Sequence, residues 1–236
     1  MDEIVKLGHL DIFTLENVMR MEYVTQAERI VRLSEIFVGI PYKANTLSFK
    51  SSCEEVLVIN FEGLDCMTLI EYTEALRLSS SFDEFKDALK RVRYRNGIVS
   101  YSERKHFFTD WIYWNEGLLE LTRYLKEGAL KYVKKNLNVK NDGTLILPGI
   151  EPQKRELAYL PTEMIDDQIL KKLSSGCYVG FYTSNDGLDC SHAGILVRKK
   201  GQLYLRHASS LKGKVLDEDF LSYVLQKEGI MVLGPG

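Results

Sequence analysis

The order of the hydrophobic patterns along the chain limits the fold to the α+β class. Apolar residues repeat at helical spacing in the first part of the chain, at 11–21, 25–37, 66–78 and 80–95. β-type runs fill the last third, and residues 199–202 join two of them as a hairpin turn. Helices followed by an antiparallel sheet are typical of an α+β domain. The other expected elements are strands at 54–61, 156–160, 178–183, 192–198, 203–208 and 229–233, and helices at 166–173 and 217–225.

The composition excludes several classes of partner. The 236 residues are enough for one large domain that needs no disulfide or metal to be stable. The formal charge is only −2, so no overall attraction to nucleic acid or an anionic membrane is expected. No apolar run reaches the length of a transmembrane helix, and the acidic start is not followed by the apolar part of an export signal. We therefore expect a cytoplasmic protein or one whose leader has been trimmed.

Cys66 stands where a loop turns into a helix. Asp65 is a good N-cap residue, which places Cys66 in the first helical turn. The unpaired N–H groups and the positive end of the helix dipole favour the thiolate there. A buried cysteine that fills a gap is an equally good interpretation until a catalytic partner is found. The other cysteines, Cys53, Cys177 and Cys190, form no C-x-x-C pair, which argues against zinc-ribbon and thioredoxin-like sites.

Two histidines offer such a partner. His192 begins one predicted strand and His207 ends the next, so a hairpin brings both imidazoles to the same end of the sheet. One can then act as a base for a thiol nucleophile while the other orients it. The alternative is two structural histidines. Small residues follow both histidines and leave room for a substrate backbone, which favours the functional interpretation. A zinc site from Cys66, His192 and His207 matches no known ligand spacing.

Four short motifs resemble, in the same order, the signatures of the NlpC-type cell-wall hydrolases, which are papain-like cysteine peptidases and amidases. They are Gly-Ile-Pro-Tyr at 39–42, Leu-Asp-Cys at 64–66, Ser-His-Ala-Gly-Ile at 191–195 and His-Ala-Ser at 207–209. A narrower resemblance, to a branch associated with N-acetylmuramoyl-L-alanine amidase activity on muropeptides, lies in segments 60–71, 93–97, 104–111 and 187–189. Together the similarity covers about residues 30–213.

The resemblance implies a papain-like core, in which the helix that carries the nucleophile packs on an antiparallel sheet. It implies Cys66 as nucleophile, His192 as general base and then acid, and His207 as the residue that orients His192. Tyr42 would line the site near the oxyanion, and Asp65 would help to seat the substrate peptide. The implied reaction cleaves the amide between N-acetylmuramic acid, in its ordinary or its 1,6-anhydro form, and L-alanine through a thioester. No cofactor or metal is implied.

Two details concern the other cysteines. The superfamily usually has Gly-Asp at the entry of the strand that precedes its histidine, and here Gly176-Cys177 stands at that position, before the predicted strand at 178–183. Since that aspartate is usually structural, the change bears on how the start of the strand is held. The dipeptide Asp189-Cys190 repeats the Asp-Cys pair, but Cys190 begins no predicted helix and we interpret it as a look-alike.

An aromatic insert is the expected substrate-binding part. Within a single domain spanning 1–236, residues 80–150 would form a helical and aromatic subdomain. Tyr94, Tyr101 and Trp111 offer flat faces for sugar rings, and Arg104 can pair with a peptide carboxylate. Such aromatics more often belong to the core. His106 either faces the ligand or is a structural histidine.

Other functions use the same residues. The first is an endopeptidase that cuts the γ-D-glutamyl to diamino acid bond with the same triad, and the second is a muropeptide-binding module without catalysis. In each case the expected partner is a peptidoglycan fragment rather than nucleic acid, and the chain is expected to be a monomer. By resemblance the protein belongs in the periplasm or cell envelope after loss of a leader, with the cytoplasm as the alternative.

Overall fold

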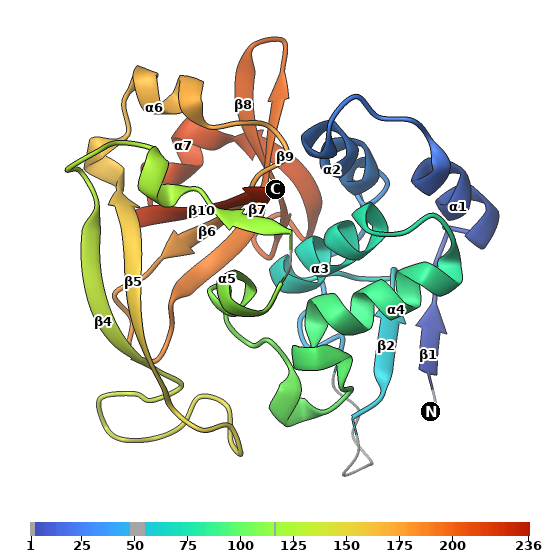
Figure 1. The fold of residues 1–236 in the computed structure, drawn as a ribbon, viewed down its shortest axis with the longest axis horizontal. Helices are drawn as coiled ribbons and strands as arrows, with labels where there is room; N and C mark the ends of the chain where they lie inside the picture. Colours follow the sequence, from blue (N-terminus) through green and yellow to red (C-terminus); the bar gives the residue numbers. More distant parts are fainter. Residues whose placement is uncertain (1–2, 48–54, 116) are drawn as a thin grey trace.

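A layer of helices packs beside an antiparallel sheet in the computed structural model, which describes residues 3–47, 55–115 and 117–236 (Figure 1). The helical layer holds α1 (Ile12–Arg20), α2 (Gln26–Glu35), α3 (Cys66–Arg77) and α4 (Phe82–Arg93). Strands β1 (Glu3–Lys6) and β2 (Leu57–Asn60) pair in parallel beside these helices. The predicted combination of helices with an antiparallel sheet is confirmed.

Within the described residues, the larger sheet has eight strands, and all their pairings are antiparallel. Their order is β4-β5-β10-β6-β7-β8-β9, with β3 beside β10. These strands are β3 (Leu118–Glu120), β4 (Lys131–Leu137), β5 (Gln153–Pro161), β6 (Tyr178–Tyr182), β7 (Cys190–Lys199), β8 (Gln202–Ser209), β9 (Lys214–Asp219) and β10 (Gly229–Pro235). The shorter helices are α5 (Asp110–Trp114), α6 (Asp167–Lys172) and α7 (Phe220–Val224).

Helix α3 is buried on all sides. All its residues from 68 to 76 are buried, between α2, α4 and the strands β7 and β8. Side chains of α1–α4 and one face of the sheet form a first hydrophobic core, and the other face packs with α6 and α7 in a second. Because both faces of β7 are covered, Ile195 and Val197 join the first core while Leu196 joins the second. Packing on every side therefore fixes the position of Cys66, the first residue of α3.

The predicted helix at 217–225 is wrong in its first three residues. Residues 214–219 form strand β9, which pairs with β8 along its whole length, and only 220–224 are helical. The strand is favoured because Asp217 lies opposite Arg206 and pairs with it at 2.8 Å. Asp219 ends the strand and caps α7 by accepting a hydrogen bond from Ser222 N. The apolar spacing that indicates α7 begins only at Phe220, and the residues before it belong to the strand.

Residues 80–150, the expected insert, are spread over both layers. Helix α4 packs on α3, and its apolar side chains belong to the first core. Further along, β3 adds to one side of β10, and β4 forms the edge of the larger sheet beside β5. The lysines of 131–135, which indicate only a basic segment in the sequence, lie on this edge strand, where charge discourages pairing with other chains.

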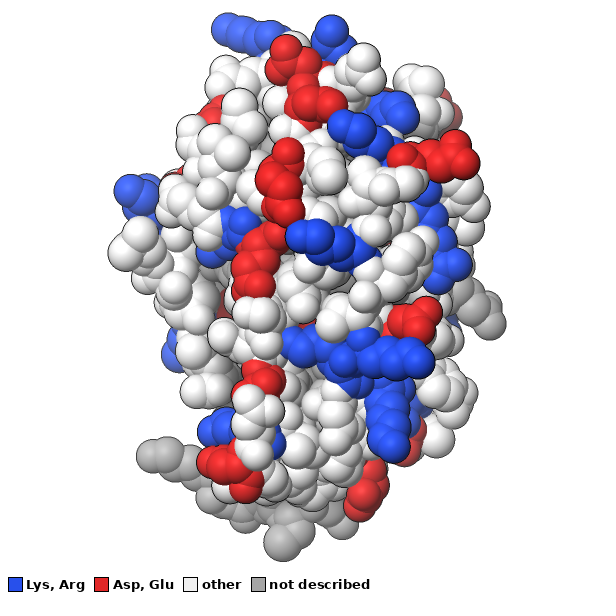
Figure 2. Space-filling view, turned by 90° about the vertical axis from the view of Figure 1, so that its left-hand side faces the viewer, with Lys and Arg blue, Asp and Glu red and all other residues white. Residues whose placement is uncertain are grey.

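The surface carries both signs of charge. Figure 2 shows the face to the left in Figure 1, over β4 and β5, where acidic and basic side chains are intermixed. This pattern agrees with the formal charge of −2 and provides no single-sign field for a polyanion on this face. Among the helices of the described residues, none is both long and apolar enough for a membrane span.

A buried ion pair joins α3, α4 and β2. Arg93 Nε donates to Glu71 Oε2 at 2.7 Å, and Arg93 Nη1 donates to the carbonyl oxygen of Val58 at 2.6 Å. Both charged side chains are almost fully buried. Burial raises the pKa of Glu71, while the Arg93 charge acts to lower it. Removal of either partner would leave an uncompensated charge in the core.

We expect Arg93→Ala to lower the free energy of unfolding by about 3–5 kcal/mol, because Glu71 loses its buried partner. Urea unfolding of the wild type and the variant measures the change. Lys131→Ala is the control, since its pair with Glu163 lies exposed on the surface and should contribute less than about 1 kcal/mol. A cost for Arg93→Ala no larger than that of the control would contradict the expectation.

Candidate active site

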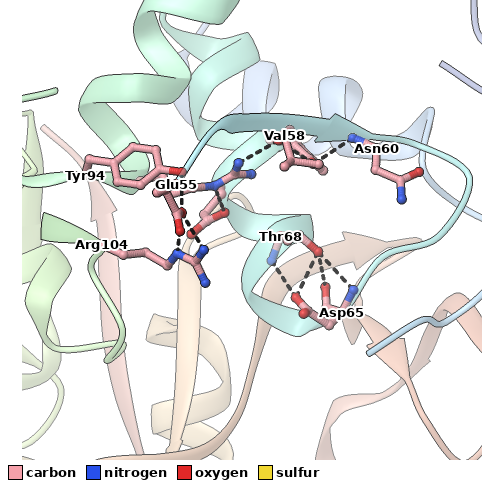
Figure 3. A network of polar contacts seen from close by, with 10 residues as sticks. Glu55, Val58, Asn60, Asp65, Thr68, Tyr94 and Arg104 are labelled. Atoms are coloured by element: carbon pink, nitrogen blue, oxygen red, sulfur yellow. Dashed lines mark hydrogen bonds and ion pairs between the residues drawn. The ribbon is translucent and has the colours of Figure 1, made fainter. Parts of the chain in front are cut away.

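Cys66 occupies the first turn of α3, as the sequence predicts. The Asp65 carboxylate caps the helix by accepting a hydrogen bond from Thr68 N at 2.8 Å, and Asp65 N donates to Thr68 Oγ1 at 2.9 Å (Figure 3). These reciprocal bonds form a capping box. They hold the turn that carries the thiol in a single conformation.

The thiol of Cys66 is not activated at rest in the way the helix terminus suggested. Burial raises its pKa to about 12, and the Asp65 charge adds to that increase. The backbone N–H groups of Ala193, Cys66 and Met67 act in the opposite direction, as a helix N-terminus should. Desolvation outweighs them, so the thiol is neutral near pH 7 and needs a base to give up its proton.

His192 and His207 meet as the predicted hairpin requires. His192 Nε2 and His207 Nδ1 lie 2.7 Å apart, and the two rings are almost perpendicular. Ala193, next to His192 in β7, has its backbone N–H close enough to Cys66 to lower the pKa of the thiol. The chain therefore brings the nucleophile helix and the histidine hairpin together.

Both imidazoles are neutral in this environment. Burial, followed by the nearby His207 and Lys227, lowers the pKa of His192 to about 3. Burial also lowers the pKa of His207, although Glu218 acts to raise it. A neutral His192 has a lone pair with which to accept a proton. The site thus holds a neutral thiol and a neutral base.

A β-bulge separates His192 from Cys190. Phe181 pairs with His192 and Tyr182 pairs with Cys190, so Ser191 is an extra residue in β7. Cys190 packs against the first core, whereas the His192 ring stacks at 6.3 Å on Phe181 of the second core. Bulges re-aim side chains in this way. Cys190 begins a strand and no helix, in agreement with its interpretation as a look-alike.

Two residues that the sequence analysis missed complete this group. Glu218 Oε2 on β9 lies 2.6 Å from His207 Nε2. The Tyr223 ring on α7 packs edge-on against His207 at 5.0 Å and lies 6.0 Å from His192. Both fall in the segment predicted as one helix. Strand pairing of 214–219 with β8 is the signal that would have placed Glu218 beside His207.

Tyr42 is held beside the start of α3. Pro41 O accepts a hydrogen bond from Leu64 N at 3.0 Å, and Tyr42 N donates to Gly213 O at 2.8 Å. Burial raises the pKa of Tyr42, and the nearby Cys66 and Asp65 add to this. Tyr42 therefore lies close to the thiol. Its role near an oxyanion stays a prediction.

Residues 32–230 match the model of the AmiA-like family, described as N-acetylmuramoyl-L-alanine amidase-like. The chain belongs to this amidase-like family. All of the residues described above, from Tyr42 to Tyr223, lie inside the matched segment.

Solved structures share the fold over almost the whole chain. An N-acetylmuramoyl-L-alanine amidase from Bacteroides uniformis is 27% identical, with a TM-score of 0.74 over 89% of this chain and 98% of the other. A Legionella pneumophila protein is 23% identical, with a TM-score of 0.80 over 95% and 94%, and this likeness concerns the fold alone. A Bacteroides fragilis protein with a provisional name as a xylanase is 29% identical, with a TM-score of 0.71 over 85% and 98%. Among curated proteins, none matches this sequence.

Tyr94 and Arg104 of this amidase-like chain share one internal partner. Tyr94 Oη donates to Glu55 Oε1 at 2.8 Å, and Arg104 Nε donates to the same oxygen at 3.0 Å (Figure 3). The Tyr94 ring is buried, so it presents no face to a sugar. Arg104 already has a carboxylate partner within the chain. This placement agrees with a structural role for both residues rather than the expected substrate contacts.

Trp111 and His106 are also engaged inside the protein. Trp111 is fully buried and packs edge-on against Tyr178 at 5.3 Å, which corresponds to the core alternative and not to a sugar platform. His106 Nε2 lies 2.9 Å from Tyr101 O, and its ring packs against the Tyr101 ring. The Tyr101 side chain is partly exposed. A role for His106 in ligand binding stays a prediction.

The small residues after the histidines serve packing between strands. A Cβ atom on Gly194 would lie 2.8 Å from Arg206 O and 3.1 Å from His207 Cβ. Ala193 and Ala208 are likewise buried. The space expected for a substrate backbone is therefore occupied by β8, and Gly194 lets His207 approach β7 closely.

Surface pockets lie away from this group. Pockets of about 400 and 690 Å³ flank α5 and share Ile112 and Tyr113. Neither is lined by Cys66, His192 or His207. The larger one reaches the last turn of α3, at the opposite end from Cys66.

We expect Gly194→Ala to reduce amidase activity by roughly 10- to 100-fold, because the added methyl group must displace the β8 backbone that carries His207. Steady-state turnover of a muropeptide measures the loss, and thermal unfolding verifies that the variant is folded. Gly236→Ala is the control, since the nearest atom to its Cβ would be 3.5 Å away. A folded Gly194→Ala protein with wild-type turnover would contradict this role for Gly194.

Proposed function

We propose that this chain is a cysteine amidase that hydrolyses the amide between N-acetylmuramic acid and L-alanine in peptidoglycan fragments. The observation that carries the proposal is that Cys66, at the start of α3, lies against the backbone N–H of Ala193, the residue next to His192 of the bonded pair His192–His207, in a chain of the amidase-like family. A thiol with an adjacent imidazole base and a second group orienting that base is the arrangement used by thiol nucleophiles.

The reaction begins with attack of the Cys66 sulfur on the lactyl carbonyl carbon of the muramic acid. His192 takes the thiol proton as the C–S bond forms, since the raised pKa of Cys66 and the lowered pKa of His192 both favour neutral groups before attack. Backbone N–H groups at the start of α3 lie beside the sulfur and would stabilise the oxyanion, each such donor contributing roughly 3 kcal/mol. Tyr42 would lie near the same oxygen.

Collapse of the tetrahedral intermediate breaks the C–N bond. The protonated His192 gives its proton to the departing amine of L-alanine and leaves a thioester on Cys66. A water molecule then attacks this thioester after His192 accepts one of its protons, and the muramic acid leaves as a carboxylic acid while the thiol is restored. Asp65, which caps α3 beside Cys66, would help to seat the peptide.

The broader proposal is a papain-like enzyme of the NlpC type. It is supported by a nucleophile at the N-terminus of a helix packed on an antiparallel sheet, with the base on a strand of that sheet. The substrates of such enzymes occur in the cell envelope, which is the compartment we propose for this chain.

Cys66→Ala and His192→Ala should each abolish hydrolysis, with losses of at least roughly 1,000-fold, because they remove the nucleophile and its base. His207→Ala should cost less, because it removes only an orienting contact. Release of peptide from a defined muropeptide, followed by chromatography, measures the rates, and thermal unfolding tests the fold of each variant. Substantial turnover by folded Cys66→Ala or His192→Ala would overturn the assignment.

Mass spectrometry of the products identifies the bond that is cut. We expect free disaccharide and an intact stem peptide from a disaccharide peptide, with and without a 1,6-anhydro end on the sugar. Shortened stem peptides would instead establish the γ-D-glutamyl endopeptidase activity. Parallel reactions of Cys66→Ala exclude cleavage by a contaminating enzyme.

The pH profile should show an acid limb well below pH 6.5. His192 must be neutral to accept the thiol proton, and its lowered pKa of about 3 keeps it neutral down to about pH 4. Stability also declines with acid but begins to do so at a higher pH, because the unfolded chain binds a proton at His192 below about pH 6.5 that the folded chain does not bind. Activity at pH 5 close to that at pH 7, in samples that remain folded, is the expected result. A limb centred near pH 6.5 would show a base with an ordinary pKa.

A further inference from the structure

We propose that Glu218 is a positioning residue of the active site, which fixes the protonated nitrogen of both imidazoles through a chain of hydrogen bonds from Glu218 through His207 to His192. This inference rests on the proposed function of Cys66 and His192. It adds a carboxylate from a third strand to the three residues that the motifs indicate.

The three side chains form a continuous chain across adjacent strands. Glu218 Oε2 on β9 lies 2.6 Å from His207 Nε2, and His207 Nδ1 on β8 lies 2.7 Å from His192 Nε2 on β7. His207 is almost fully buried, and Glu218 is partly exposed. His207 pairs with Leu216 in the sheet, so Glu218, two residues further along β9, points to the same face as His207.

The chemistry of the three groups then determines where the protons lie. An ionised carboxylate only accepts hydrogen bonds, so His207 Nε2 must carry the hydrogen that Glu218 accepts. A neutral imidazole has a single N–H group, which leaves His207 Nδ1 as an acceptor. His192 Nε2 must therefore donate to it. The lone pair of His192 is left on Nδ1. This nitrogen takes no part in the hydrogen bonds from Glu218 to His192 and is available for the proton of Cys66.

The surroundings favour this proton arrangement. If His207 Nδ1 instead donated to His192 Nε2, His207 would carry a proton on both nitrogens. Burial disfavours this charged form, because it lowers the pKa of the His207 ring despite Glu218. Tyr223 packs against both rings, and Lys227 lies 4.7 Å from the centre of the Tyr223 ring. Asp217, the neighbour of Glu218 on β9, pairs with Arg206 and Lys199. Among the described residues, Glu218 is thus the carboxylate in hydrogen-bond contact with His207.

The proton positions can be observed directly in the wild-type protein. Two-bond ¹H–¹⁵N NMR spectra distinguish the two neutral forms of each histidine ring, and spectra of His192→Ala and His207→Ala assign the signals. We expect both rings with the hydrogen on Nε2. A hydrogen on Nδ1 of His192 or of His207 would overturn the inference. This result does not depend on which substrate the enzyme cuts.

Glu218→Gln tests the consequence for turnover. The glutamine amide can direct its NH₂ group to His207 Nε2. His207 Nδ1 then donates to His192 Nε2, and the hydrogen of His192 moves to Nδ1. We expect kcat on the muropeptide to fall roughly 10- to 100-fold with KM within about twofold, and the His192 signals to change to the Nδ1–H form. Glu218→Asp, which keeps the carboxylate at a shorter reach, should retain more activity than Glu218→Gln.

Glu163→Gln is the matched control, since it makes the same chemical change at an exposed pair with Lys131. A purely structural role would lower the melting temperature of Glu218→Gln without altering the ring signals at temperatures where it is folded. Wild-type kcat together with unchanged His192 signals in folded Glu218→Gln would overturn the proposal. If the wild type does not hydrolyse muropeptides at all, the proposed function fails, while the NMR result still decides the role of Glu218.

Discussion

Helix α3 carries two carboxylates into the core, and the need to pair them governs how the helical layer meets the sheet. Glu71 is paired with Arg93 of α4, and Glu74 is paired with Arg77 and accepts a hydrogen bond from Tyr178 on β6. Unpaired, each charge would cost several kcal/mol. Arg77 belongs to α3 itself, whereas Arg93 and Tyr178 lie on two other elements, so these two together favour one rotation and one height of α3. Cys66, at the end of that helix, acquires its position from contacts made a turn or more away.

On the sheet side of the site, burial keeps the reacting groups uncharged, in contrast to the paired charges of α3. Desolvation holds the Cys66 thiol and the His192 ring neutral, and the helix terminus is too weak to reverse this for the thiol. A neutral pair has no strong attraction of its own to hold it together. The position of the His192 ring must therefore be set by packing and hydrogen bonding. His207, Phe181 and Tyr223 contact it from three different elements.

The parts of the site that could be predicted from sequence are those that local chemistry determines. The Asp65 cap and the hairpin between β7 and β8 involve residues close in the chain, and both are confirmed. Glu218 was missed because its role depends on pairing of β9 with β8, which overrides the helical spacing of the residues after it. Tyr94 and Trp111 show a second limit of prediction from sequence, which concerns aromatic residues. An aromatic side chain suits a core and a sugar site equally well, and only the surrounding fold decides between them.

The two Asp-Cys dipeptides show how the same local pair leads to different outcomes. Asp65 accepts from a residue three positions later and so begins a helix, with its cysteine at the positive end of the dipole. Asp189 instead accepts from Thr109 N and Thr109 Oγ1, eighty positions away, and from Cys190 N, which ties the start of β7 to the segment before α5. Its carboxylate is committed to a tertiary contact, so no helix begins there, and the bulge at Ser191 turns Cys190 into the first core. The place of a cysteine in the fold therefore depends less on which residue comes before it than on whether that residue's side chain is free to cap a helix.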